Sequence, residues 1–243
     1  RWLPAIAPGE LRLQAFGVTE PGAGSDTSRI ATRAVREADG SWRVRGQKIW
    51  TSRALHSDLM LLLARTTPRD EVERRGDGLS VFLLDLRELK DRGVTIQPVE
   101  TMINHNTTQV FFDDVRLPAD ALVGEEGSGF RYILDGMNAE RILIAGESLG
   151  DARWFIDRAV AYANDRRVFD RAIGANQGVQ FPLAQAYAQT EAAELMARKA
   201  AALFDAGEPC GPEANMAKYL TGEAAWAAGE ACMQTFGGFA FAT

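Results

Sequence analysis

The feature that most constrains the fold is a change in hydrophobic period close to residue 120. Upstream of it, short apolar runs are separated by Gly, Pro, Asp and Asn, a pattern typical of an antiparallel sandwich or barrel. Downstream, apolar residues recur with the spacing of a helical face. We therefore predict an α+β multidomain chain, with an antiparallel β sandwich or barrel domain over residues 1–120 and an antiparallel α-helical bundle over residues 121–243.

The β domain contains a hairpin signal near its start. Asp39-Gly40 separates two strand-like segments, residues 31–36 and 42–45, and an Asp-Gly pair between such segments is typical of a hairpin. Further short apolar runs predict strands at residues 59–64, 79–84, 94–96 and 110–112.

The second half divides into three long helical segments. Phe130, Ile133 and Met137 fall on one face of a helix that we predict to run to about residue 167. A second helix is predicted over residues 177–206, with Gly207 as its stop, and a third over residues 212–235. Three long helices joined by short loops predict most of an antiparallel bundle.

The composition narrows the function classes. The formal net charge of −6 argues against a general nucleic-acid or anionic-membrane binder. The chain has no run of about 18 apolar residues, so no transmembrane helix is predicted. Cys210 and Cys232 lack a Cys-x-x-Cys spacing, and we predict buried free thiols. His56 and His105 fit no metal-ligand pattern, which predicts surface or packing roles and no metal site.

One segment has the residues of a ligand-binding turn. Residues 16–26 read Phe-Gly-Val-Thr-Glu-Pro-Gly-Ala-Gly-Ser-Asp, and such glycines let a ligand approach the backbone and its N–H groups closely. On its own, a Pro-Gly-x-Gly run is more often a plain tight turn. This segment is not alone, because Gly-Gln-Lys-Ile-Trp-Thr-Ser follows at residues 46–52, beyond the predicted hairpin.

These two segments resemble the two flavin-contacting segments of the acyl-CoA dehydrogenase family. Residues 111–118 resemble the family's exit from its β domain, and residues 124–130 resemble its entry to the helical domain. Residues 165–169 and 234–238 resemble two later segments, so the resemblance covers essentially the whole chain in order. It implies the family's fold without its N-terminal helical domain and its fourth bundle helix, and we expect the chain to be a piece of a longer protein.

The resemblance implies FAD as the cofactor, held between the β domain and the helical domain. Phe16, Val18 and Thr19 would line one face of the isoalloxazine, and the Thr19 hydroxyl would polarise the ring. Trp50 would pack against the flavin, and Ser52 would hydrogen-bond its edge. An apolar slot with a few polar groups suits a flat cofactor.

The family also takes part of its FAD contact from a neighbouring subunit. The residues at the matching positions are Arg166, Phe169, Gln177, Gln234, Gly237 and Gly238. Arg166 suits the pyrophosphate, because a guanidinium forks onto phosphate oxygens. The shared site implies a homo-oligomer, a dimer of dimers in the family.

The implied reaction is the α,β-dehydrogenation of an acyl-CoA thioester, as in fatty-acid β-oxidation. It needs a carboxylate close to Cα that removes a proton while a hydride leaves Cβ for flavin N5. Some family members supply this Glu from the first bundle helix, immediately before an Arg, which predicts Glu140 as the base. Most members supply it from a later segment, beyond Thr243, which stays the alternative. Arg141, Asn138 and Ser25 match substrate-side positions, with Ser25 near the pantetheine arm.

Three departures from the family pattern bear on the site. Asp170 stands where the family has Gly, and it would bring a carboxylate near phosphate. Ala240 stands where Gly is common, and Ser52-Arg53 is an unusual continuation of the second flavin segment.

Two alternative functions stay open. Acyl-CoA oxidases and flavin monooxygenases share the architecture and differ in whether oxygen reaches the reduced flavin. A non-catalytic flavin-fold protein that binds DNA or a partner would need a basic face, which the acidic chain does not indicate. For the dehydrogenase, the resemblance implies an electron-transferring flavoprotein as acceptor, no membrane insertion, and the bacterial cytoplasm or the mitochondrial matrix as compartment.

Overall fold

The computed structural model describes residues 1–90, 92–103 and 106–242. The chain forms two compact units, Arg1–Ile133 and Leu134–Thr243, and each is described by itself. His105 lies outside the described residues, so its surface or packing role stays a prediction.

Within the described residues, the first unit holds one eight-stranded sheet. Its strands are β1 (Leu13–Gly17), β2 (Arg33–Arg36), β3 (Trp42–Ser52), β4 (Leu59–Arg65), β5 (Leu79–Asp85), β6 (Val94–Pro98), β7 (Thr107–Leu117) and β8 (Leu122–Val123). The order is β6–β7–β3–β2–β4–β5–β8, with β1 paired to β4.

Most neighbouring strands pair antiparallel, as the turn signals predicted. The hairpin around Asp39-Gly40 is confirmed, because β2 and β3 pair from Arg33–Arg45 to Arg36–Trp42. Two pairings differ, since β1 and β2 both run parallel to β4. Parallel pairing is possible here because the chain crosses over before it returns to these strands, instead of turning back in a tight hairpin.

Short helical turns connect the strands of the first unit. They are α1 (Leu3–Ile6), η1 (Thr27–Arg29), η2 (Ala54–His56), η3 (Arg69–Glu71), α2 (Leu86–Leu89) and η4 (Ala119–Ala121). His56 is exposed in η2, which agrees with the surface role predicted for it.

The core of the first unit lies on the strands at the middle of the sheet. β4 is buried along nearly its whole length, as expected of a strand covered on both faces. Trp42 and Phe82 are fully buried and meet edge to face, with ring centroids 5.1 Å apart. Burying a large apolar side chain contributes about 1.5–3 kcal/mol, so this core holds the sheet together.

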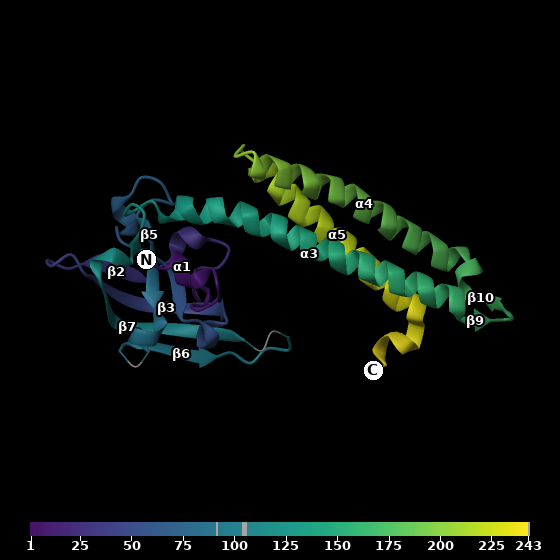
Figure 1. Ribbon diagram of the computed structural model, residues 1–243, viewed down its shortest axis with the longest axis horizontal. Coiled ribbons are helices and arrows are strands. Elements are labelled where there is room, and N and C mark those ends of the chain that lie inside the picture. Colours follow the sequence, from purple (N-terminus) through teal and green to yellow (C-terminus); the bar gives the residue numbers. More distant parts are fainter. Residues whose placement is uncertain (91, 104–105, 243) are drawn as a thin grey trace. The chain divides into compact units, whose positions relative to one another are not determined.

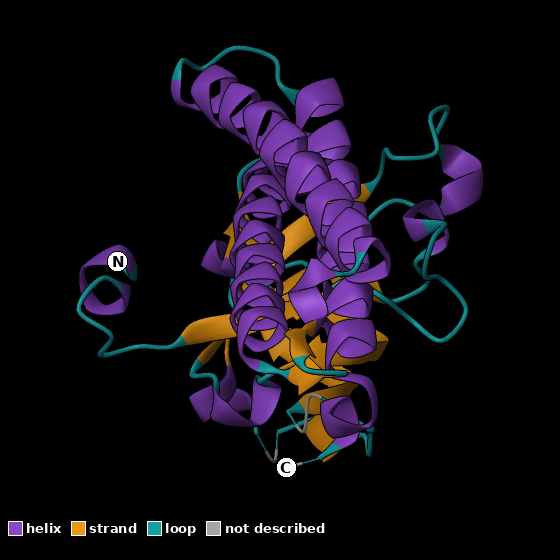
Figure 2. Ribbon diagram, turned by 90° about the vertical axis from the view of Figure 1, so that its right-hand side faces the viewer, coloured by secondary structure: helices purple, strands orange, loops and turns teal. Residues whose placement is uncertain are grey.

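The second unit consists of long helices that run side by side (Figure 1 and Figure 2). These are α3 (Gly129–Asp165), which begins in the first unit, α4 (Gln177–Asp205) and α5 (Gly211–Phe236). A small hairpin, β9 (Arg167–Val168) and β10 (Arg171–Ala172), and the turn η5 (Ile173–Ala175) join α3 to α4. The hairpin and the last turn, η6 (Gly237–Phe241), lie at the same end of the bundle (Figure 1). All three predicted helices are confirmed.

Alanine fills most of the core of the helical unit. The buried alanines of the three helices include Ala145, Ala152, Ala186, Ala193, Ala197, Ala200, Ala217, Ala224 and Ala228. Two buried threonines among them satisfy their hydroxyls locally, because Thr190 and Thr221 each donate to a carbonyl one turn earlier at 2.8 Å. The distance between packed helices depends on the side chains at their contact, and small side chains permit a close approach.

Two further predictions concern the thiols and the membrane. Cys210 and Cys232 are confirmed as buried free thiols. Within the described residues, no helix combines the length and the apolar character needed to span a bilayer.

The alanine core gives a direct test of packing. Ala193 is 2% exposed and its neighbour Ala192 is exposed, and both lie in the middle of α4. Ala193→Leu must overpack the core and is expected to lower the free energy of unfolding by about 1–3 kcal/mol. Ala192→Leu is the control and should change it by less than about 0.5 kcal/mol. Urea denaturation followed by circular dichroism measures both, and equal losses would contradict the packing argument.

Candidate functional site

The end of β1 and the end of β3 are brought together in the first unit. The backbone N–H of Ile49 donates to the carbonyl oxygen of Thr19 at 2.9 Å. One residue earlier on β3, Lys48 Nζ donates to the carbonyl oxygen of Val18 at 2.9 Å. Segment 16–19 and segment 50–52, which hold five of the predicted flavin contacts, therefore lie beside each other.

Trp50 is held in a left-handed backbone conformation, with φ of 61°. The pairing of β3 with β7 shifts register between Lys48 and Thr51, so Trp50 lies in a bulge. This region is unfavourable for a bulky residue, by about 1–2 kcal/mol, and bulges re-aim side chains next to functional sites. The result is an indole that is 57% exposed, near the partly exposed Phe16 and Ser52.

A buried ion pair fixes the loop that follows β1. Lys48 Nζ lies 2.8 Å from Glu20 Oε1, and the two side chains are 0% and 8% exposed. The Glu20 carboxylate also accepts the backbone N–H groups of Ala31 at 2.7 Å and Thr32 at 2.9 Å. One carboxylate thus joins both ends of the segment between β1 and β2 to β3.

Burial and pairing shift both pKa values of this pair. Burial lowers the pKa of Lys48 to about 8, although the charge of Glu20 opposes this fall. Burial raises the pKa of Glu20, but the charge of Lys48 and the hydrogen bonds from Lys48, Thr32 and Ala31 outweigh burial, so this pKa is lowered overall. Each charge thus favours the charged form of its partner.

Gly46 makes room for this arrangement. It has φ of +146°, and a Cβ at this position would lie 2.6 Å from the Cα of Thr32. The Thr32 hydroxyl donates to the carbonyl of Gln47 at 3.2 Å. A side chain at position 46 would push Thr32 away from Glu20, which explains in physical terms why the second motif begins with Gly.

Three predicted site residues lie on the part of α3 in the second unit. Arg141 Nη1 donates to Asn138 Oδ1 at 3.1 Å, so the two predicted substrate-side residues are joined. Glu140 is exposed, with half-buried Met137 and Ile144 one turn away on either side. The apolar neighbours predicted for Glu140 are present on the same face. Ser25, the other predicted substrate contact, lies in the first unit and is exposed.

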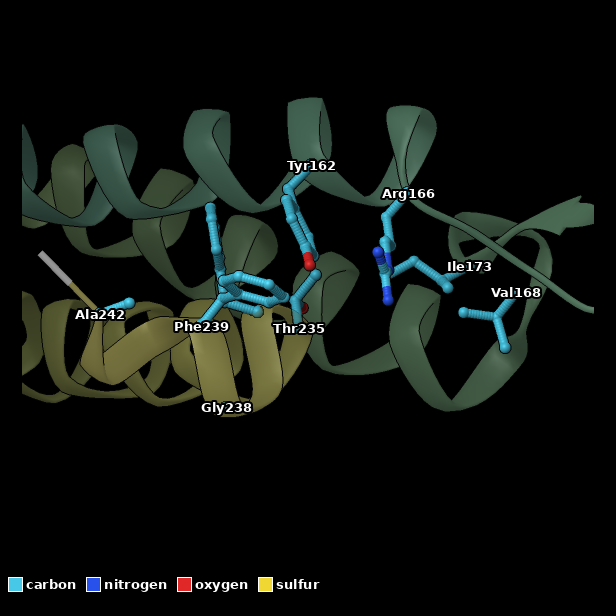
Figure 3. A pocket seen from close by; sticks show the side chains of 9 residues that line it. Tyr162, Arg166, Val168, Ile173, Thr235, Gly238, Phe239 and Ala242 are labelled. Atoms are coloured by element: carbon cyan, nitrogen blue, oxygen red, sulfur yellow. The ribbon is translucent and has the colours of Figure 1, made fainter.

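A cavity of about 620 Å³ lies at the end of the helical unit. Tyr162 of α3 and Arg166, the residue that follows the end of α3, extend into it opposite Thr235 of α5 and Phe239 of η6 (Figure 3). Phe236 stacks on Tyr162, with ring centroids 4.2 Å apart and an interplanar angle of 17°. The remaining lining residues are Val168, Ile173, Gly238 and Ala242. A guanidinium beside an aromatic wall can hold a phosphate group attached to a flat ring system.

The other predicted contacts of this end lie around the cavity rather than in its lining. Phe169 is 94% exposed at the tip of the β9–β10 hairpin, where Phe169 and Asp170 both have positive φ, 53° and 63°. Gln177 is the exposed first residue of α4, and Gln234 is exposed in the last turn of α5. Gly237 ends α5 with φ of 60°. Of the six residues predicted for this region, Arg166 and Gly238 share the cavity.

Sequence reasoning missed several residues of both regions. Tyr162 lies four residues before Arg166, whose backbone N–H donates to the Tyr162 carbonyl at 2.8 Å, and that spacing could have identified it. Thr235 and Phe236 lie between the predicted Gln234 and Gly237. Glu20 and Lys48 belong to the two motifs, but no local pattern distinguishes a buried lysine from a surface lysine.

Comparison with known proteins assigns the family. Residues 15–115 match the family described as "Acyl-CoA dehydrogenase, middle domain", and residues 127–243 match "Acyl-CoA dehydrogenase, C-terminal domain". This chain belongs to the acyl-CoA dehydrogenase family. The resemblance and the fold predicted from the sequence are confirmed.

Similar proteins agree with this assignment. The chain is 40% identical to Acyl-CoA dehydrogenase FadE12 of Mycobacterium tuberculosis over 98% of its own length and 60% of that protein. A solved glutaryl-CoA dehydrogenase in complex with glutaryl-CoA is 32% identical with a TM-score of 0.90, over 99% of this chain and 60% of the other. The FAD complex of PigA is 27% identical with a TM-score of 0.90, over 98% and 61%. The chain thus spans about 60% of the length of these family members.

The Glu20–Lys48 pair predicts a specific stability effect. Glu20→Gln leaves the buried Lys48 without its counter-charge, and we expect the free energy of unfolding to fall by roughly 3 kcal/mol at neutral pH. Because the folded chain lowers the pKa of Glu20 from 4.5, the pair stabilises above that pH and loses this contribution as the pH falls through the lowered value. Urea denaturation between neutral and acidic pH should reveal this loss in the unsubstituted protein and not in the variant.

Glu37→Gln is the matched control for this prediction. Glu37 is an exposed carboxylate of the same unit, 3.3 Å from Arg43. Surface pairs contribute about 0–1 kcal/mol, so this variant should stay close to the unsubstituted protein. A loss as large as that of Glu20→Gln would show that burial of the pair is not the cause.

Proposed function

We propose that the protein to which this chain belongs catalyses the FAD-dependent α,β-dehydrogenation of an acyl-CoA thioester. A proton leaves Cα, a hydride leaves Cβ, and the product is the α,β-unsaturated thioester. The two electrons then pass to an external acceptor, for which we propose an electron-transferring flavoprotein. The bacterial cytoplasm and the mitochondrial matrix stay the predicted compartments.

The observation that carries this proposal is the outward-facing Trp50. A strained, bulged backbone keeps this indole 57% exposed beside Thr19, where folding alone would favour a buried ring. An exposed aromatic face next to an exposed Phe16 and the hydroxyls of Thr19 and Ser52 has the chemistry that a flavin ring needs. We assign Phe16, Val18, Thr19, Trp50 and Ser52 to the flavin ring.

The cavity at the end of the helical unit suits the adenosine diphosphate portion of FAD. Its volume of about 620 Å³, the Arg166 guanidinium and the stacked pair of Tyr162 and Phe236 suit a diphosphate joined to a nucleoside. We propose that this cavity holds the FAD of a neighbouring copy, with Phe169, Gln177, Gln234, Gly237 and Gly238 around it. This arrangement requires a homo-oligomer.

On the substrate side, we propose Glu140 as the base. FAD, when bound, supplies the hydride acceptor. A carboxylate that loses its water shell becomes a stronger base, and the half-buried Met137 and Ile144 beside Glu140 favour such a loss when substrate covers them. Asn138 and Arg141, joined at 3.1 Å, would orient the thioester, and Ser25 would contact the pantetheine arm.

Flavin absorbance tests this proposal directly. The full-length protein and its Glu140→Gln variant are loaded with FAD and mixed anaerobically with a panel of acyl-CoA thioesters. We expect the flavin of the unsubstituted protein to be bleached, and the flavin of the variant to be bleached about 10²–10⁴-fold more slowly, because general-base catalysis contributes factors of that size.

Glu147→Gln is the control, since Glu147 is also exposed on α3. It should bleach at the rate of the unsubstituted protein. Equal rates of flavin bleaching in all three proteins would show that the base is another residue, and the proposed reaction would stand. Absence of bleaching with every thioester would refute the reaction, and rapid reoxidation of the bleached protein by air would favour an oxidase.

A further inference from the structure

The loop between β1 and β2 exposes most of its tip. Its residues Pro21, Gly22, Gly24, Ser25 and Asp26 are all exposed. A Cβ added to Gly22 or Gly24 would meet no atom within 4 Å, so these two positions have no packing neighbour. Ala23 between them is buried, and two backbone hydrogen bonds of 3.1 Å between Glu20 and Ala23 close the turn. The turn is thus anchored at Glu20, and the position of Ser25 beyond it also depends on the second end of the loop.

The first end is set by Glu20, through the bonds to Lys48, Ala31 and Thr32 described above. The second end is set by Arg65, the last residue of β4, which is 7% exposed. Arg65 Nη2 donates to the carbonyl of Ser28 at 2.7 Å, and Arg65 Nε donates to that of Ile30 at 3.1 Å. The backbone N–H of Arg65 also donates to Thr32 at 2.8 Å.

The remaining bonds of Arg65 tie the same guanidinium to the β4–β5 connection. Arg65 Nη1 donates to the carbonyls of Thr67 at 3.3 Å and Asp77 at 3.4 Å. Within the described residues, all the hydrogen bonds of this guanidinium go to backbone carbonyls. A cation with such partners is costly to bury, and burial lowers the pKa of Arg65 accordingly. An apolar side chain could fill the same space without this cost. The charge of Arg65 is therefore explained by the carbonyls it holds.

Ser28 connects Arg65 to the exposed end of the loop. The Ser28 hydroxyl donates to the carboxylate of Asp26, the residue that follows Ser25. We propose that Arg65 is a positioning residue for the CoA portion of the substrate, because it fixes the loop that presents Ser25. This inference rests on the proposed function. Arg65 itself has no contact with substrate in this role, and it acts through the carbonyls of Ser28 and Ile30.

Arginine is suited to this task in a way that lysine is not. Its planar guanidinium presents donors in a fixed fork and stays charged, so it can hold several carbonyls at set positions. Lysine has one compact charge on a flexible stem and can satisfy only some of them. Arg65→Lys should therefore recover part of what Arg65→Met loses.

The test uses the FAD-loaded full-length protein and the variants Arg65→Met, Arg65→Lys and Arg33→Met. Arg33 is an exposed arginine on the adjacent strand and serves as the matched control. Hydrogen–deuterium exchange of residues 21–30 reports the order of the loop, and steady-state kinetics report KM and kcat separately. In Arg65→Met we expect faster exchange and a KM for acyl-CoA raised about tenfold, with kcat within about twofold and FAD content unchanged. Arg65→Lys should be intermediate, and Arg33→Met should match the unsubstituted protein.

The outcomes separate this inference from the proposed function. An unsubstituted protein that turns over no acyl-CoA refutes the proposed function. Turnover with an unchanged KM in Arg65→Met overturns the role of Arg65, as does unchanged exchange of residues 21–30. A fall in kcat with no change in KM would also overturn it, since it would indicate damage elsewhere. If Arg65→Met does not fold, Arg65→Lys carries the same comparison.

Discussion

The buried ion pair between Glu20 and Lys48 is the interaction on which the first unit's site depends. It joins three segments that are distant in sequence, because Lys48 also binds the carbonyl of Val18 and Glu20 also binds the N–H groups of Ala31 and Thr32. Charges at this depth are tolerated only when nearly every donor and acceptor is used. The pair therefore permits few alternative arrangements of the loop, and its contribution is to specificity of structure as much as to stability.

The core of the helical unit is built from neutral side chains, in contrast to the ion pair of the first unit. Its core contains many alanines, and the hydroxyls of Thr190 and Thr221 donate to carbonyls of their own helices. Ion pairs between the helices, Arg153 with Glu191 and Glu194 and Lys199 with Glu213, lie outside this core. Each helix then relies on many small contacts spread along its length. At the end of this packed region, Tyr162 of α3 and Phe236 of α5 stack on each other, and with Arg166 they line the cavity. The buried Ala159 and Ala231 lie in the adjacent core cluster.

Local patterns predicted the order and type of the elements, the hairpin at Asp39-Gly40 and the three long helices, because periodicity and turn chemistry act over a few residues. The motifs predicted the family. What the sequence could not predict depends on contacts between distant residues. The parallel pairing of β1 and β2 with β4, the burial of Lys48 and Arg65, and the left-handed conformation of Trp50 are all of this kind. A lysine and an arginine within strands would ordinarily be assigned to the surface. The roles of Glu140, Ser25 and the other proposed contacts stay predictions.

The bulge at Trp50 has a consequence for the thermodynamics of recognition. Its backbone is fixed by the register shift against β7 and by the bond between Ile49 and Thr19, both of which form when the chain folds. Ordering the backbone of one residue costs about 1–2 kcal/mol, and at Trp50 this ordering occurs when the chain folds. For the flavin contact proposed above, only the exposed side chain would remain to be ordered, at a cost of about 0.5–1.5 kcal/mol. The strained conformation therefore lowers the stability of the fold, and a ring that binds there would not have to reorder the backbone.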